Sequence, residues 1–116
     1  MIDLKSFGDL SGMELGKFKP KPTSFTKGQV EAVAELWALT GGMTRIGVCE
    51  CTPGRFSADR TQSSKICHIL SGSATVQGKR GSDLRHLGAG DVLVLQLDWA
   101  GKANRRFMKR CARPMC

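Results

Sequence analysis

The sequence predicts an all-β protein, a sandwich or a barrel built from short strands. Between residues 47 and 97, apolar runs rich in Val, Ile and Thr are separated by Gly, Pro and Asp. Runs of about four to eight such residues between turn residues are typical of strands, and short strands at regular spacing are typical of sandwiches and barrels. A chain of 116 residues is long enough for one domain with a core of its own.

Residues 1–28 precede this pattern and are expected to form an extended segment that packs on the barrel. The run Lys17–Pro22 holds proline at alternate positions, and proline disfavours helix both at its own position and at the residue before it. A polybasic ligand-binding arm is the alternative for this run. The apolar side chains available for packing are Leu10, Met13 and Phe18.

Residues 29–39 are compatible with two structures. Their composition favours a helix, but apolar residues also recur at every second position from Val30 to Ala38. A Thr40-Gly41-Gly42 turn then joins the segment to residues 43–48, which is a β-hairpin pattern.

The remaining strands are predicted at 47–51, 55–57, 65–72, 73–77, 83–87 and 92–95. Turns are expected at 52–54, 78–81 and 88–91, with Asp91 fixing its turn through backbone hydrogen bonds. Since side chains alternate along a strand, Lys65, Cys67 and Ile69 should face one side. Ile66, His68 and Leu70 should then face the other.

Two segments carry a family resemblance. Cys67–Gly72 followed by Gly88–Leu95 resembles the two half-motifs of the cupins. Gly47–Phe56 is similar to the small single-domain cupins of the ureidoglycine aminohydrolase and ethanolamine-utilisation type, and the resemblance covers roughly Trp37 to Gly101. It implies a cupin double-stranded β-helix, the RmlC-like jelly-roll barrel, usually a homodimer with the ligand or active site inside. The resemblance also favours a strand from about Glu35, and a helix remains an alternative for the residues before Glu35.

The cupin resemblance also implies a metal site, held by two histidines, a glutamate and a further histidine, a set that suits Mn, Fe, Ni or Zn. In this chain Lys65 stands at the glutamate position, the histidine pair falls within residues 58–61, and the last histidine falls on Gly101. None of these is a ligand set, so we expect no metal and no other cofactor. Gln96 and Asp98 stand where the family commonly has proline and glycine in a turn.

Six residues are predicted to bind a ligand: Glu50, Arg55, Arg60, Lys65, Cys67 and Trp99. An inward-facing Lys65 needs a compensating interaction. It could anchor a carboxylate or form a Schiff base, pair with Glu50 or Asp59, or point outward at the entrance of its strand.

The predicted mouth of the barrel holds two arginines. Arg55 and Arg60 lie in the loop that lines the mouth in the resembled family, where they could bind a small anion above Trp99. The alternative is that both are solvated surface charges.

The cysteines allow two interpretations. Cys49 and Cys51 share one face of a strand and, with Cys67, could bind zinc or form a redox pair. Alternatively, all three are small buried side chains. An odd total of five cysteines favours a reducing compartment.

A cytoplasmic location is expected. The residues after Met1 lack the pattern of a signal peptide. No apolar run approaches the length of a membrane span, so no membrane partner is expected.

The formal net charge of +8 is concentrated at one end of the chain. Residues 101–116 hold six of the 18 Lys and Arg and no acid, which leaves 12 basic against 10 acidic residues elsewhere. The rest of the chain is therefore nearly neutral, and no nucleic-acid partner is expected. Nucleic-acid binding through the basic segment would show a steep salt dependence.

The basic segment from about residue 101 is atypical, because the resembled family should continue there with a last strand. Plausible codons for residues 106–116, read one frame over, encode that expected strand. We therefore hypothesise that residues from about Gly101 are a frameshifted version of the last strand of a single barrel spanning 29–116.

The functional prediction is a small polar or anionic metabolite bound in the barrel without the usual metal. An enzyme acting on a small nitrogenous or sugar-like metabolite, as the resemblance implies, is the alternative. No catalytic residue can be named from the sequence.

Overall fold

The computed structural model describes residues 7–41, 43–78, 84–105 and 109–113 and contains one short helix and ten strands. The helix is α1 (Phe7–Gly12), and the strands are β1 (Lys19–Pro20), β2 (Val30–Ala38), β3 (Arg45–Cys51), β4 (Gly54–Asp59), β5 (Lys65–Ser71), β6 (Ser73–Gly78), β7 (Arg85–Gly88), β8 (Val92–Leu95), β9 (Ala100–Arg105) and β10 (Lys109–Arg113). The predicted all-β class is confirmed. Most of the turn expected at 78–81 lies outside the described residues.

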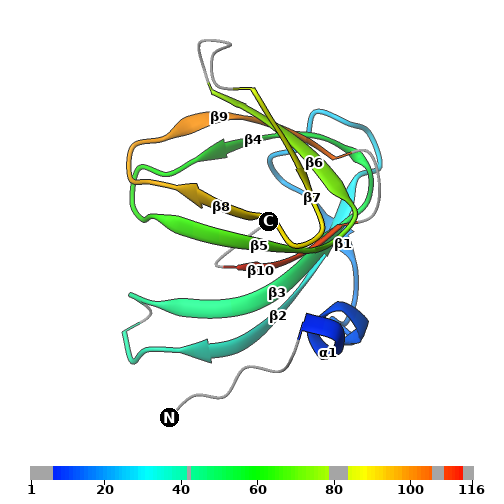
Figure 1. Ribbon diagram of the computed structural model, residues 1–116, viewed down its shortest axis with the longest axis vertical. Helices are drawn as coiled ribbons and strands as arrows, with labels where there is room; N and C mark the ends of the chain where they lie inside the picture. The colour runs from blue at the N-terminus through cyan, green and yellow to red at the C-terminus, as the bar shows by residue number, and fades with distance from the viewer. Residues whose placement is uncertain (1–6, 42, 79–83, 106–108, 114–116) are drawn as a thin grey trace.

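The strands form two antiparallel sheets that curve around a common interior (Figure 1). The larger sheet has the order β1-β2-β3-β10-β5-β8, and the smaller has the order β4-β9-β6-β7. The chain crosses repeatedly from one sheet to the other, as in a jelly roll. Backbone pairing does not run continuously around the interior, so the fold is a roll of two sheets rather than a closed barrel.

Strand β2 begins at Val30, five residues earlier than expected. It pairs with β3 from Glu31 opposite Cys51 to Ala38 opposite Arg45. The helix considered for the residues before Glu35 is therefore wrong, since pairing with β3 overrides the helical propensity of these residues. The predicted hairpin is confirmed, because the Leu39 N–H donates to the Thr44 carbonyl at 2.8 Å.

A bulge interrupts the β2–β3 ladder between Glu35 and Trp37. The residue opposite is Gly47, where a Cβ atom would lie only 2.6 Å from the Ala34 carbonyl oxygen. The missing side chain lets the two backbones approach at the bulge. Leu36, the extra residue, packs in the cluster beneath α1.

The N-terminal segment packs on the roll as predicted, but part of it is helical. Leu10 of α1 is buried with Val48 and Leu70 on the outer face of the larger sheet, and Met13 packs beside them. Phe18, the third predicted contact, is 40% exposed. The extended structure expected throughout residues 1–28 is thus wrong for Phe7–Gly12, and residues 1–6 lie outside the described part.

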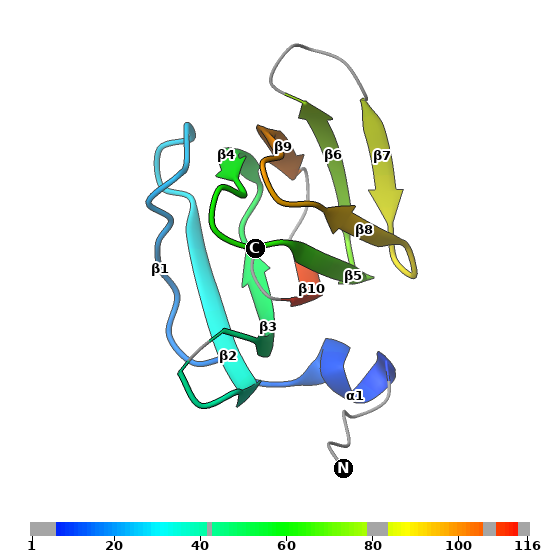
Figure 2. The same cartoon turned by 90° about the vertical axis from the view of Figure 1, so that its left-hand side faces the viewer.

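Residues 19–29, which we call the strap, connect the two sheets along one side of the roll (Figure 2). The strap pairs with β2 through β1, and the Phe25 N–H donates to the Arg55 carbonyl of β4 at 2.8 Å. The Ser57 N–H of β4 returns a bond to the Thr23 carbonyl at 3.1 Å. The open edges of β2 and β4 are thereby covered by one segment.

The basic C-terminal segment supplies central strands to both sheets. β9 lies between β4 and β6, and β10 lies between β3 and β5. The six basic side chains of residues 101–116 lie outside the described side chains. At the level of the backbone, however, this segment is part of the roll and is not an appended arm.

Candidate functional site

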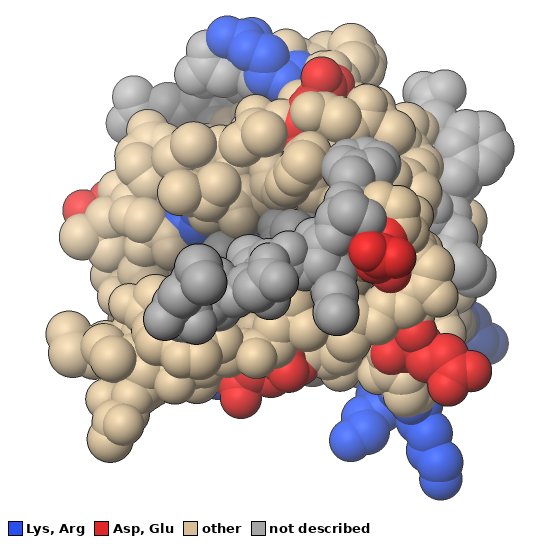
Figure 3. Space-filling view, turned by 60° about the horizontal axis from the view of Figure 1, so that its bottom comes forward, with Lys and Arg blue, Asp and Glu red and all other residues tan. Residues whose placement is uncertain are grey.

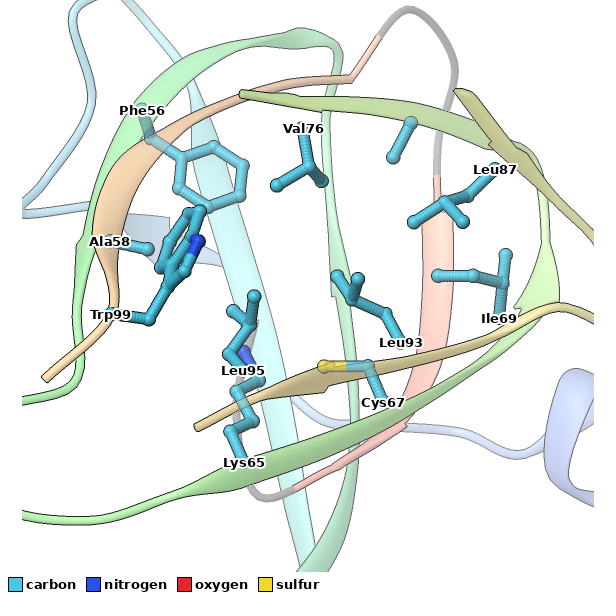
Figure 4. A pocket seen from close by; sticks show the side chains of 11 residues that line it. Phe56, Ala58, Lys65, Cys67, Ile69, Val76, Leu87, Leu93, Leu95 and Trp99 are labelled. Carbon is cyan, nitrogen blue, oxygen red and sulfur yellow. The ribbon is translucent and has the colours of Figure 1, made fainter. Parts of the chain in front are cut away.

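A small cavity lies between the two sheets (Figure 4). Its volume is about 30 Å³, far below the roughly 300–1,000 Å³ of sites for drug-sized ligands. The described residues that line it are Phe56, Ala58, Lys65, Cys67, Ile69, Ala74, Val76, Leu87, Leu93, Leu95 and Trp99. The cavity therefore suits a few non-hydrogen atoms with mostly apolar neighbours.

Strand β5 provides one wall through residues two apart. Lys65, Cys67 and Ile69 all line the cavity, as the alternation predicted. On the other face of β5, Ile66 is 59% exposed, whereas Leu70 is covered by Leu10 of α1. β8 continues the wall, because Leu95 and Leu93 stand directly opposite Lys65 and Cys67.

Lys65 is the charged member of this lining, and it is only 5% exposed. Figure 4 shows its side chain rising from β5 into the cavity beside Leu95. The outward orientation considered for Lys65 is therefore wrong. Of the two acids considered as partners, Glu50 lies on the opposite face of the larger sheet, and exposed Asp59 accepts a bond from the Thr61 N–H at 2.9 Å.

Trp99 lines the cavity from the loop before β9, and a tight turn fixes its position. The Trp99 N–H donates to the Gln96 carbonyl at 3.0 Å, and Asp98 between them has a φ of 71°. Two backbone hydrogen bonds join this turn to Arg60. The Arg60 N–H donates to the Trp99 carbonyl at 2.8 Å, and the Asp98 N–H donates to the Arg60 carbonyl at 2.7 Å. The indole is thus held at one end of the cavity.

The structure brings together three of the six predicted site residues, namely Lys65, Cys67 and Trp99. Glu50 does not line the cavity, because Cys49 and Cys51 on either side of it face the interior. Arg55 points outward for the same reason, since its neighbour Phe56 faces inward.

Arg60 is also absent from the lining. Its guanidinium donates to Ser63 twice, to the carbonyl at 3.1 Å and to the hydroxyl at 2.6 Å. The anion site expected from Arg55 and Arg60 above Trp99 is therefore not assembled by these contacts.

The three cysteines of the interior are buried side chains. Cys67 packs with Cys49 and Ile69, whereas Cys51 packs with Phe56 and Val76. Cys51 and Cys67 are not in disulfides, but Cys49 is, which does not fit the reducing compartment that the number of cysteines favoured. Within the described residues, no three His, Cys, Asp or Glu side chains lie close enough to hold a metal ion.

A second buried cation was missed by sequence reasoning. The Lys21 side chain is 2% exposed, lies 2.7 Å from the Glu31 carboxylate and stacks over the Phe56 ring at 4.2 Å. Next to it, the Gln29 amide donates to the Thr52 carbonyl at 3.0 Å and accepts from the Ser24 hydroxyl. These polar contacts lie behind Phe56 and form the outer support of the cavity wall.

On the face drawn in Figure 3, the basic and acidic side chains of the described residues form separate small groups among uncharged residues. In the part of the chain that the structure describes, no helix is long and apolar enough to cross a membrane.

A model of the EutQ-like cupin domain matches residues 39–108, which is more than half of the chain. The chain belongs to the EutQ-like cupin family. Among curated proteins, none matches this cupin in sequence.

Solved structures agree with this cupin in fold. The EutQ protein of Clostridium difficile superposes with a TM-score of 0.63 at 11% identity, over 74% of this chain and 67% of that one. A cupin-2 domain protein of Shewanella frigidimarina gives a TM-score of 0.59 at 10% identity, over 71% of this chain and 76% of that one. Identities this low establish the fold alone.

A protein of unknown function from Pseudomonas syringae pv. tomato gives a TM-score of 0.71 at 18% identity. The match covers 85% of this cupin but only 44% of the Pseudomonas protein. This cupin therefore corresponds to less than half of that relative.

Proposed function

We propose that this cupin binds a small molecule with a short apolar body and one anionic group, held between the two sheets. The observation that carries the proposal is the composition of the cavity lining that the structure describes, in which Lys65 is the one charged residue among eleven. An ammonium in apolar surroundings forms a stronger hydrogen bond with an anion than it does in water. The apolar remainder of the lining suits a hydrocarbon body.

The size of the cavity narrows the ligand class. A volume of about 30 Å³ is well below the roughly 150 Å³ that holds benzene in an engineered apolar cavity. Short-chain monocarboxylates are the class that combines one anionic group with so small a body. A sugar-like or nitrogenous metabolite would bring several polar groups among described lining residues that offer few hydrogen-bonding partners, so these residues favour the monocarboxylate over such a metabolite.

Trp99 supplies a direct test of this proposal. The chain has two tryptophans, so the Trp37→Phe variant leaves the Trp99 indole as the sole tryptophan reporter. We expect propionate to change its fluorescence saturably, and we expect propionamide, the uncharged analogue, to bind about tenfold more weakly or worse. Equal binding of the two would contradict the proposal.

Two lysine substitutions complete the test. Lys65→Met in the same background should abolish propionate binding because it removes the charge. Lys27→Met is the matched control, because Lys27 lies on the exposed part of the strap. This variant should bind propionate with unchanged affinity. Retained affinity in Lys65→Met would also contradict the proposal.

We also propose that this cupin is a homodimer joined through the outer face of β5 and β8. Ile66, Val92 and Val94 are 59%, 58% and 56% exposed, and Ile66 stands opposite Val94 in the ladder. β8 is an edge strand of the larger sheet, and an exposed apolar edge is suited to pairing with a second copy.

Sedimentation of the Val94→Lys variant tests the dimer. We expect the wild type to sediment as a dimer and Val94→Lys as a monomer, whereas Val33→Lys, an exposed apolar position on β2, should remain dimeric. A monomeric wild type or a dimeric Val94→Lys would exclude this interface. The cytoplasmic location is likewise a proposal, which cell fractionation can test.

A further inference from the structure

We propose that Cys49 of β3 is bonded to Cys111 of β10, and that this cross-strand disulfide makes the stability of the larger sheet depend on redox conditions. The bond goes beyond the proposed small-molecule site and does not depend on it. It needs only the residues that the chain has, so it holds whether or not the C-terminal segment arose by a frameshift.

The number of cysteines limits the partner of Cys49. The chain has five cysteines, of which Cys49 is in a disulfide, whereas Cys51 and Cys67 are not. Within one chain, the partner is therefore Cys111 or Cys116. Cys116 lies outside the described residues, whereas the backbone of Cys111 belongs to β10.

The register of the larger sheet favours Cys111. β10 lies between β3 and β5 (Figure 1), and Cys111 stands directly opposite Cys49 in the antiparallel ladder. The Cα atoms of directly opposite residues in such a ladder lie about 4.5–5.5 Å apart, within the range of roughly 4.4–6.8 Å that a disulfide spans. On its other side Cys111 stands opposite Ile69, which belongs to the same buried cluster as Cys49.

A disulfide at this position would close a long loop. It would join β3 to β10 across residues 50–110 and so restrict the unfolded chain. β10 is the strand through which β3 and β5 meet. Without the bond, β10 is held only by backbone pairing and packing, so reduction is expected to destabilise the larger sheet.

The reduction balances with a dithiol as the reductant. One thiolate of the dithiol attacks a sulfur of the Cys49–Cys111 bond, the S–S bond breaks, and the other cysteine leaves as a thiolate that takes up a proton. The second thiolate of the dithiol then attacks the mixed disulfide, which releases the remaining cysteine and closes the dithiol to a cyclic disulfide. Cys49 is 0% exposed, so we expect the attack to require opening of β10.

Peptide mapping without a reductant tests the pairing. Thiols outside disulfides are blocked with N-ethylmaleimide, the protein is cut with trypsin, and we expect a cross-link between peptides 46–55 and 111–116. Each of these peptides holds two cysteines, so variants locate the bond. Cys51→Ser and Cys116→Ser should keep the cross-link, and Cys111→Ser should lose it. Loss of the cross-link in Cys116→Ser, its absence from the wild type, or a bond between two chains on a non-reducing gel would overturn the pairing.

Urea denaturation with and without dithiothreitol tests the redox dependence, with titration of the thiols to verify that the bond has been reduced. We expect reduction to raise the equilibrium constant for unfolding of the wild type about 100-fold. Cys111→Ser is the control, because without the bond its midpoint should be the same under both conditions. A wild-type midpoint that reduction leaves unchanged, or one that dithiothreitol lowers equally in Cys111→Ser, would overturn the redox dependence.

The rate of reduction tests the buried position of the bond and needs no variant. We expect dithiothreitol to reduce the native protein at least about tenfold more slowly than the urea-unfolded protein. Equal rates would place the bond outside the buried cluster of Cys49 and overturn the proposal.

Discussion

Lys21 is buried although its sequence neighbours suggest an exposed basic run. Its ammonium is held between the Glu31 carboxylate and the face of the Phe56 ring. The Glu31 side chain is 21% exposed, so the pair is only partly removed from water. A fully buried pair costs about 3–5 kcal/mol to break, and partial exposure lowers that cost.

We therefore expect Lys21→Ala to lower the free energy of unfolding by about 1–3 kcal/mol. The loss combines the ion pair, the contact with Phe56 and the packing of the lysine stem. Urea denaturation measures it, with Lys27→Ala as the exposed control on the same segment, expected within about 0.5 kcal/mol of the wild type. Equal effects of the two substitutions would show that the burial of Lys21 contributes nothing.

Asp98 is in a left-handed backbone conformation, with a φ of 71°. Glycine adopts this conformation at the lowest cost, and aspartate tolerates it better than most residues. Asp98→Gly should therefore raise the free energy of unfolding by up to about 1 kcal/mol, seen as a higher midpoint of thermal unfolding.

Asp91 provides the contrast to Asp98, and the structure confirms its predicted role. Its carboxylate accepts the Gly88 N–H at 2.8 Å, so Asp91→Gly removes a bond and should be destabilising. A rise in the midpoint for Asp91→Gly, or a fall for Asp98→Gly, would contradict the assignment of the two turns.

The hairpin β2–β3 depends on one glycine. A Cβ atom at Gly47 would meet the Ala34 carbonyl oxygen at 2.6 Å, and a backbone atom cannot rotate away as a side chain can. Gly47→Ala should destabilise by about 1–3 kcal/mol, measured by urea denaturation. Gly88→Ala in β7 is the control, because nothing lies within 4 Å of a Cβ atom there. A Gly47→Ala protein as stable as Gly88→Ala would mean that the ladder relaxes at the bulge without cost.

At the level of elements, strands β3 to β8 were predictable, whereas helix α1, the place of the strap and the division of the C-terminal segment into β9 and β10 were not. Alternation from Lys65 to Leu70 fixed which side chains face inward, so Lys65 and Cys67 were placed correctly. Helix α1 gave no signal, because it has six residues, three of them with low helical propensity, and is held by the tertiary contacts of Leu10.

The errors in the predicted site have a common cause. The sequence shows that Cys49 and Cys51 share a face, but it does not show that this face is the interior, and that choice decides the place of Glu50. The burial of Lys21 depends on the strap meeting β2 and β4, which are distant pairings without a local pattern. Trp99 was placed because the family resemblance located its loop.

At the scale of the molecule, both sheets depend on the basic C-terminal segment. Removing residues 100–116 would take β9 from between β4 and β6, and β10 from between β3 and β5. We expect the truncated chain to show no cooperative urea transition, since four strands lose a neighbour at once. A transition with the slope of the full-length protein would show that the two strands are dispensable.

The same arrangement rules out truncation as a test of nucleic-acid binding through this segment, because loss of binding would follow from loss of the fold. The frameshift hypothesis stays a prediction. Sequencing the coding DNA around codons 100–103 decides it, and an unshifted frame would reject it.

The place of β10 in the larger sheet also has a consequence for synthesis. Its partners β3 and β5 emerge from the ribosome long before it does, yet they meet only through it. Until Arg113 has left the exit tunnel, the edges of β3 and β5 that face β10 have no hydrogen-bonding partner. During that interval the nascent chain can bind chaperones or aggregate.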